Sequence, residues 1–115
     1  MTDANNPAAL TDTHNLKQLL QFQEKAIVSR TLVKNAGGSV TLFAFDGDER
    51  LSEHTAPFDA LAIGVEGRAE IPVGGVRHTV TEGDALLMPA GIPHAVNPLG
   101  PFKMLLVMIR GEKGK

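Results

Sequence analysis

Cysteine is absent from this chain of 115 residues, and its absence excludes three kinds of chemistry. A chain without cysteine forms no disulfides, has no thiolate nucleophile and holds no metal through sulfur. Tryptophan and tyrosine are absent too, so the aromatic residues other than histidine are five phenylalanines. The sequence therefore offers no aromatic platform on which nucleic-acid bases or sugar rings would stack.

Long runs of one charge or of apolar residues are also missing. Thirteen acidic and eleven basic residues give a net charge of −2, and the one basic cluster is RGEKGK at 110–115. Because nucleic-acid binding needs a clustered basic footprint, we expect no nucleic-acid partner. No apolar run is long enough to span a bilayer, and residues 1–15 lack the pattern of a secretory signal. We therefore expect no membrane contact and a cytoplasmic location.

The chain does contain many short β-type segments separated by glycine and proline. Runs rich in β-branched or apolar residues occupy 26–33, 40–45, 59–67, 68–73, 76–80, 85–89, 94–96 and 102–109. Gly74-Gly75 is a strong signal for a two-residue hairpin, and it places His78 opposite Ile71 on an apolar face. We interpret His78 as a core or interface residue rather than a ligand. Many strands at near-regular spacing predict an all-β antiparallel sandwich or barrel.

The N-terminal region has a different character. Residues 1–13 are polar without periodicity, and we interpret them as a flexible arm that precedes a single barrel domain at 14–115. Three leucines at helical spacing follow the arm: Leu16, Leu19 and Leu20. With Thr13 as the N-cap, they predict one or two helical turns that pack on the outside of the barrel.

The most distinctive stretch is GDALLMPAGIPH, residues 83–94. Five residues separate Gly83 from Pro89, one separates Pro89 from Gly91, and two separate Gly91 from His94. This spacing resembles the second conserved motif of the cupins, small β-barrels whose motif-two histidine points into the barrel and often binds a metal. The resemblance implies an antiparallel jelly-roll barrel, or double-stranded β-helix, of the RmlC-like type.

The first cupin motif is only half present. It would read histidine, any residue, histidine, a few residues, glutamate, and then six residues and a glycine. With Gly67 as that glycine, the resemblance places His54 at the first histidine, Ala56 at the second and Ala60 at the glutamate. Alanine has no donor atom, so His54 and His94 are the two metal ligands left, whereas a protein site for a divalent ion takes three or four. We therefore expect metal binding to be weak or absent.

Strand alternation suggests a pocket in the same region. Successive side chains of a strand point to opposite faces, so a regular strand puts Ala56, Ala60 and Ala62 on the face of His54. Such small residues leave room in the barrel, and together with His54 and His94 they predict a pocket for a small organic molecule. The alternative is that the long side chains of 85–89 and 102–109 fill that room.

Three functions remain open for the two histidines, and no catalytic residue is assigned. The first is a barrel in which His54 and His94 orient or protonate an organic ligand, since imidazole titrates near neutral pH. The second is a metal-dependent dioxygenase or isomerase with an unrecognised third ligand. Asp59 would be that ligand if a bulge near Pro57 turned it inward, and Glu53 is another acid nearby. The third is a sensing or storage module without chemistry.

The opposite face of the same strand predicts self-association. Leu61, Ile63 and Val65 fall on it, and a row of exposed branched side chains favours a partner. Cupins commonly bury such a surface between two subunits, so we expect a homodimer. The N-terminal leucines are an alternative cover for part of this row.

Overall fold

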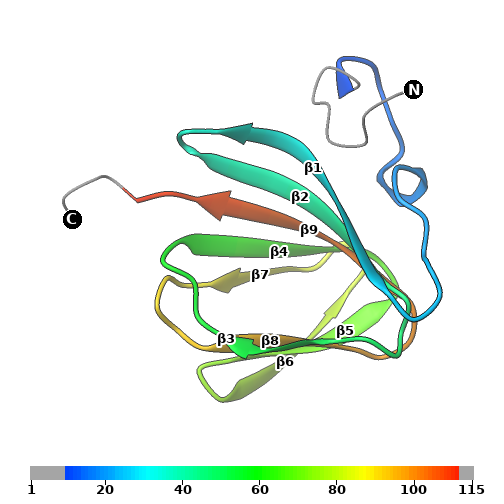
Figure 1. The fold of residues 1–115 in the computed structure, drawn as a ribbon. Helices are drawn as coiled ribbons and strands as arrows, with labels where there is room; N and C mark the ends of the chain where they lie inside the picture. Colours follow the sequence, from blue (N-terminus) through cyan, green and yellow to red (C-terminus); the bar gives the residue numbers. More distant parts are fainter. Residues whose placement is uncertain (1–9, 112–115) are drawn as a thin grey trace.

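The computed structural model describes residues 10–111 and has two antiparallel sheets that form a barrel (Figure 1). The strands are β1 (Ile27–Asn35), β2 (Gly38–Phe45), β3 (Leu51–His54), β4 (Asp59–Glu66), β5 (Arg68–Val73), β6 (Val76–Thr81), β7 (Ala85–Met88), β8 (His94–Pro98) and β9 (Phe102–Ile109). One sheet has the order β1-β2-β9-β4-β7 and the other β3-β8-β5-β6. The predicted all-β jelly roll is confirmed. Across residues 10–111 no helix has the length and apolar character to cross a membrane.

The hairpin predicted at Gly74-Gly75 joins β5 to β6. Both glycines have positive φ angles, 58° and 84°, which residues with a Cβ adopt at a cost. Val73 lies opposite Val76 and Ile71 lies opposite His78, the register that a two-residue turn predicts. The predicted pairing of this hairpin is therefore confirmed.

The connection between β3 and β4 corrects one expectation. β3 ends at His54, residues 55–58 cross from the four-stranded to the five-stranded sheet, and β4 begins at Asp59. A regular strand through His54, Ala56 and Ala60 is therefore wrong. His54 and Ala60 lie on facing sheets, and Ala56 lies in the crossover.

The main core fills the space between the two sheets. Its buried members come from both sheets: Phe45, Ala60, Ala62, Ala69, Ile71, Val80, Met88, Val96, Phe102 and Met104. The rings of Phe45 and Phe102 are completely buried, with centroids 5.8 Å apart. Aromatic burial of this size is a main source of stability in a small domain.

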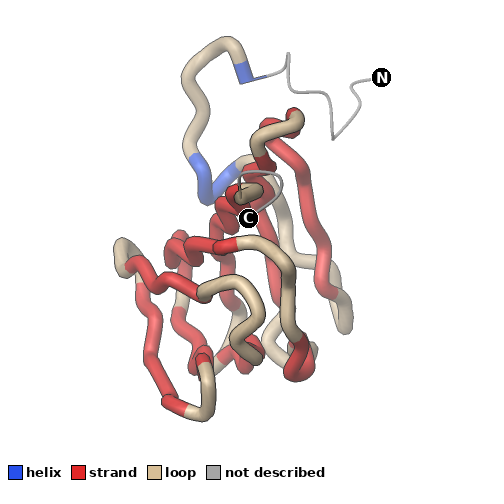
Figure 2. The backbone as a smooth tube through the Cα atoms, turned by 90° about the vertical axis from the view of Figure 1, so that its left-hand side faces the viewer, coloured by secondary structure: helices blue, strands red, loops and turns tan. Residues whose placement is uncertain are grey.

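A second, smaller cluster lies on the outer face of the five-stranded sheet. Leu32, Leu42 and Val65 are buried there, and the N-terminal segment packs against them. The leucines that make this contact are Leu10, Leu19 and Leu20. The segment runs outside the sheets (Figure 2), so its predicted packing on the outside of the barrel is confirmed. Residues 1–9 of the predicted arm lie outside the described residues.

The predicted helical turn is a short 3₁₀ helix, η2 (Leu16–Gln18). Its N-cap is Asn15 and not Thr13, because the Asn15 side chain accepts a hydrogen bond of 2.9 Å from the backbone N–H of Lys17. An Asn side chain in this position satisfies a free N–H at the start of the helix.

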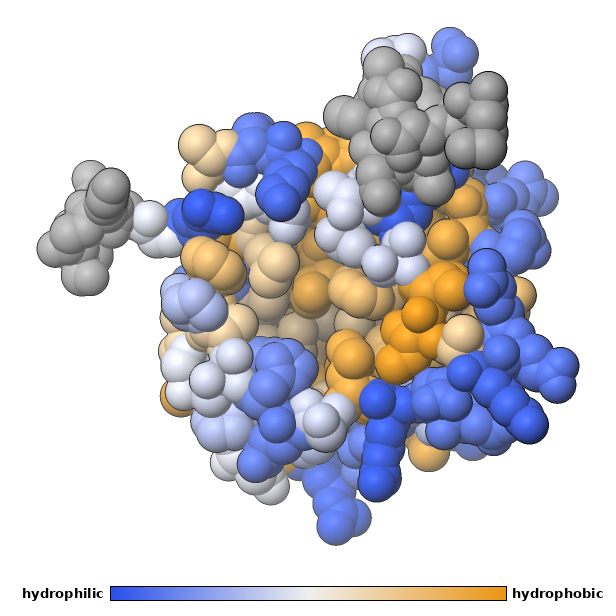
Figure 3. Space-filling view, in the orientation of Figure 1, coloured by the Kyte–Doolittle hydropathy of each residue, from blue (hydrophilic) through white to orange (hydrophobic). Residues whose placement is uncertain are grey.

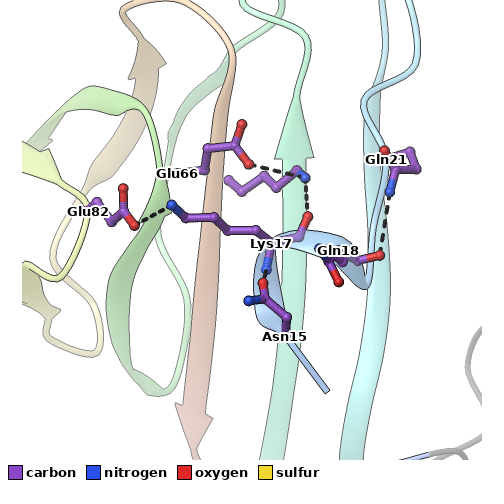
Figure 4. A network of polar contacts seen from close by, with 7 residues as sticks. Asn15, Lys17, Gln18, Gln21, Glu66 and Glu82 are labelled. Carbon is purple, nitrogen blue, oxygen red and sulfur yellow. Dashed lines mark hydrogen bonds and ion pairs between the residues drawn. The ribbon is translucent and has the colours of Figure 1, made fainter.

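Lys103 holds this segment to the sheet. Its side chain is almost fully buried, its ammonium donates to the backbone carbonyl of Lys17, and the same nitrogen lies 3.3 Å from the Glu66 carboxylate. Figure 4 shows these two partners, Glu66 and the η2 residue Lys17. The Phe22 ring centroid is 4.7 Å from the same ammonium. Lys17 in turn pairs with Glu82. These partners offset the cost of burying the Lys103 charge.

Candidate functional site

The two histidines singled out in the sequence lie side by side at one end of the four-stranded sheet. His54 is the last residue of β3 and His94 is the first residue of β8, and the two are directly opposite in the antiparallel pair. Their ring centroids are 4.5 Å apart and their planes are inclined by 68°. Two positions distant in the sequence thus form one edge-to-face pair. Their role in ligand binding stays a prediction.

Both imidazoles belong to rows that face the barrel interior. Residues directly opposite in an antiparallel pair share a face of the sheet. His94 lies opposite Val73, which packs against the core, and two residues before Val96, which is buried in it. His94 therefore faces inward, and His54, its partner across the ladder, faces the same way.

The hydrogen bonds of the two rings determine where their lone pairs lie. His54 Nδ1 is 2.8 Å from the Ser52 carbonyl oxygen, and His94 Nδ1 is 3.1 Å from that of Ile92. Because a carbonyl oxygen only accepts, each Nδ1 carries the proton and each neutral ring keeps its lone pair on Nε2. This is the arrangement by which proteins orient a histidine toward a metal or a ligand proton.

The two rings differ in their surroundings. His94 is 5% exposed, whereas His54 is exposed at the barrel edge. Burial lowers the pKa of His94 below its ordinary value of 6.5, the hydrogen bond to the Ile92 carbonyl opposes this, and the neighbouring His54 adds to the lowering. His94 is therefore neutral at pH 7, the form that accepts a proton.

Asp59 and Glu53, the two acids considered as a third metal ligand, are found in other environments. Asp59 Oδ1 accepts a hydrogen bond of 2.9 Å from the backbone N–H of Ala90, which ties the start of β4 to the loop before His94. Glu53 is exposed on β3. In the part of the chain that the structure describes, no three His, Cys, Asp or Glu side chains gather as a metal site. The donors present do not fit a resident metal ion, which takes three or four protein ligands.

Ala56 contributes its main chain instead of a side chain. Its carbonyl accepts a hydrogen bond of 2.9 Å from the N–H of Gly91, and Gly74 N–H donates to the Pro93 carbonyl at 2.8 Å. These bonds fix the loop before His94 from two sides. The sequence offers one signal for this loop, Gly91, whose φ of 77° favours glycine.

Ala60 and Ala62 lie deep in the core, with 2% and 0% exposure. Ala60 is opposite methionines of β7 and β9, and Ala62 is opposite leucines of the same strands. Long side chains therefore lie next to the small ones. This agrees with the alternative in which the side chains of 85–89 and 102–109 fill the room in the barrel. A part in lining a ligand pocket stays a prediction for Ala56, Ala60 and Ala62.

A cavity of about 250 Å³ opens on the five-stranded sheet. Its lining residues are Thr31, Lys34, Gly38, Ser39, Thr41, Phe58, Met108 and Arg110. Phe58 lies in the crossover that follows His54, and Asp59 next to it is opposite Ile109 at the end of β9. The cavity therefore lies at the end of the barrel that carries the histidine pair. Figure 3 shows an apolar hollow between the hydrophilic residues that border the two sheets.

Similarity to known proteins covers most of the chain. Residues 41–109 match the family model described as a cupin domain. A conserved protein of unknown function from Streptococcus pyogenes has a TM-score of 0.83 and 34% identity, covering 89% of this chain and 90% of that chain. A cupin superfamily protein from Desulfitobacterium hafniense has a TM-score of 0.83 and 27% identity, covering 88% and 93%.

A third solved structure is longer than this chain. A cupin 2 conserved barrel domain protein from Leptotrichia buccalis has a TM-score of 0.80 and 37% identity. The match covers 84% of this chain and 47% of that one. Among curated proteins nothing matches.

Proposed function

Because the chain belongs to the cupin family, we propose that it binds a small organic molecule inside its barrel, in contact with His54 and His94. The fold alone does not select this function, since one fold hosts many activities. The observation that carries the proposal is the histidine pair, which faces inward with Nδ1 of each ring occupied by a carbonyl. Each Nε2 is then the ring atom left for a ligand.

The electrostatics of the pair favour the transfer of a single proton. His94 is neutral at pH 7 because it is buried, and a charge on the neighbouring His54 disfavours a second charge on His94. A ligand that offers an acidic proton or a hydroxyl would therefore meet a proton acceptor at His94 Nε2. His54, at the exposed edge, would contact the same ligand from the mouth of the barrel.

A metal-dependent dioxygenase or isomerase is the second candidate. The observation in its favour is the Nδ1–carbonyl bond of each histidine, which is typical of metal-binding histidines. Such a site would use His54 and His94 and would need donors that the described residues do not gather around them. The metal-free binding site is therefore the first proposal.

A ligand screen with matched histidine variants tests this proposal. The purified protein is analysed for metal content and then screened by thermal shift against small organic acids, sugars and alcohols. A ligand that binds the folded protein raises Tm, and the gain grows with the logarithm of its concentration above Kd. This gain should disappear in His54→Asn and His94→Asn. His78→Asn is the control, because His78 is a partly buried histidine on β6, opposite Ile71.

Two results would contradict the proposal. One is stoichiometric metal that survives dialysis against a chelator, which would favour the second candidate. The other is a set of ligands that bind the two paired-histidine variants as tightly as they bind the unmodified protein.

We also propose a homodimer through the outer face of the five-stranded sheet. Register places one apolar row across all five strands: Val33, Val40, Val107, Leu61 and Leu87. Val33 and Leu87, at the two edges, are 47% and 53% exposed. The row expected at Leu61, Ile63 and Val65 is corrected at Val65, which is buried because the N-terminal leucines pack against its cluster. These leucines leave Val33 and Leu87 exposed. A twofold partner would cover the row on both subunits at once.

Sedimentation at micromolar concentration tests this assembly. Stable interfaces bury roughly 1,200–2,000 Å² in total, and burying an unpaired charge in one opposes association. Leu87→Asp should therefore convert a dimer to a monomer, whereas Leu99→Asp, a change at a similarly exposed loop residue, should not. A monodisperse monomer of the unmodified protein would refute the dimer.

A further inference from the structure

We propose that the cavity on the five-stranded sheet binds the anionic group, a carboxylate or a phosphate, of a small organic molecule. The barrel-facing positions of β2 change character along the strand. Phe45 packs in the core and Phe43 against it, whereas Thr41 and Ser39, nearer the start of the strand, line the cavity. The apolar interior thus ends in a polar corner.

Two cations border this corner. Lys34 lies opposite Ser39 on the neighbouring strand, and Ser39 is in turn opposite Met108 of β9. Arg110 is two residues after Met108, just beyond the end of that strand, and its guanidinium carbon lies 5.3 Å from the centroid of the Phe58 ring. A cation over an aromatic face is held there by the ring quadrupole. Phe58 therefore positions the Arg110 guanidinium at the cavity.

Among the described residues, no carboxylate pairs with these charges. The described lining of the cavity contains neither Asp nor Glu. Between residues 10 and 111 the ion pairs are Lys17–Glu82 and Lys103–Glu66, so neither Lys34 nor Arg110 has an acidic partner there. Two cations at one cavity repel each other, and an anion between them replaces that repulsion with attraction. The overall charge of the protein is −2, so this positive corner is a local feature.

The hydrogen-bonding groups fit an oxyanion. A guanidinium presents paired N–H donors that match the geometry of carboxylate and phosphate, and an ammonium adds a mobile charge. The hydroxyls of Ser39 and Thr41 line the same cavity and supply further donors. A volume of about 250 Å³ is below that of a typical drug-sized pocket. The cavity therefore suits one charged end of a small molecule.

This inference goes beyond the proposed function, because none of the residues that carry it is a histidine. Inorganic phosphate and succinate serve as probes of the two possible anions. Each is titrated into ¹⁵N-labelled protein at low salt, and backbone shifts at Lys34, Ser39, Thr41 and Arg110 are followed. Binding of either probe at these positions supports the proposal, and the tighter probe identifies the anion.

Matched variants separate a built site from general charge attraction. Lys34→Met and Arg110→Met should each weaken binding roughly tenfold, the usual effect of losing one charge-assisted contact. Arg77→Met is the control, since Arg77 is an exposed cation on β6, and it should leave the affinity unchanged. His54→Asn should also retain anion binding, which keeps this test separate from that of the histidine pair.

Three outcomes would overturn the inference. The first is the absence of shifts at the cavity with both probes at millimolar concentration. The second is an equal loss of affinity in Arg77→Met and Arg110→Met. The third is unchanged affinity in both Lys34→Met and Arg110→Met, with folding verified by the unaltered core resonances.

Discussion

The two segments that carry the paired histidines are held very differently. The loop before His94 is fixed by hydrogen bonds from Gly91 to Ala56, from Ala90 to Asp59 and from Gly74 to Pro93. β3, which ends at His54, is a strand of four residues whose last three are exposed. Low burial is what permits a segment to open locally. The barrel therefore presents His94 as the fixed member of the pair and His54 as the freer one.

The difference matters for what the pair can hold. A metal site needs several ligands fixed in one geometry. Here the segment before His94 is held by hydrogen bonds and β3 is exposed, and the two positions at which the cupin resemblance implies further donors hold Ala56 and Ala60. An organic ligand makes fewer geometric demands on an exposed edge. Variants that change the ligands available to the pair, or the restraints on one of the two segments, test this difference between His94 and His54.

The largest effect is expected from restoring the missing donors. Ala56→His with Ala60→Glu should raise the affinity for Zn²⁺ by at least about 100-fold, because the site then has four potential ligands. Ala60 is 2% exposed, so a carboxylate there is buried and should destabilise the metal-free protein by several kcal/mol. Thermal melts with and without Zn²⁺ measure both effects, and the metal should recover most of the lost stability.

Single variants provide the control for this experiment. Ala60→Glu alone should lose stability and regain less of it with Zn²⁺ than the double variant does. If Zn²⁺ stabilises the unmodified protein as strongly as it stabilises the double variant, the expectation that the two alanines weaken metal binding is wrong.

A smaller effect is expected from releasing the fixed segment. Asp59→Ala removes the acceptor of the Ala90 N–H, a bond whose net contribution to the free energy of unfolding is about 1 kcal/mol. Hydrogen exchange at the Ala90 amide should accelerate, together with that of its neighbours in the loop. Asp48→Ala, at an exposed turn residue, is the matched control. Equal exchange in the two variants would show that Asp59 does not restrain the loop.

The smallest effect concerns protonation. His94 has a pKa below 6.5 in the folded protein, first because it is buried. The unfolded chain then binds the proton more readily. The stability that neutral His94 contributes is therefore complete above the unfolded pKa, near 6.5, and is lost as pH falls through the lower folded pKa. An NMR titration of the imidazole protons measures this pKa.

The neighbouring histidine provides a finer test within the same titration. His54→Asn removes the part of the shift that comes from His54, so the pKa of His94 should rise slightly toward its ordinary value. His78→Asn should leave it unchanged. A His94 that titrates above 6.5 would contradict the burial argument.

Backbone constraints explain which parts of this molecule the sequence predicts. Gly74-Gly75 and Gly91 need positive φ, and their hairpin and loop are found where their spacing indicates. The change of sheet at residues 55–58 has no such glycine. Pro57 indicates an irregular strand there, but neither it nor side-chain alternation says to which sheet the chain continues. For this reason the regular strand expected through Ala56 was wrong.

Long-range polar contacts were equally hidden from the sequence. The sequence allows Asp59 as an inward-turned ligand, yet its side chain accepts a hydrogen bond from the Ala90 backbone, and a backbone donor has no sequence pattern. Asn15 caps η2 in place of Thr13 because the helix starts at Leu16, two residues later than a cap at Thr13 implies. Both sites depend on tertiary placement, which overrides local preference.

The buried ammonium of Lys103 is a natural chemical probe of local opening in this protein. Acylating reagents modify amines that reach solvent, and this amine lies beneath the backbone of Lys17 and the ring of Phe22. Lys103 should therefore react when residues 15–22 lift from the sheet, whereas the exposed Lys34 reacts at all times. The ratio of the two labelling rates, read from one mass spectrum, gives the free energy of that opening in the unmodified protein.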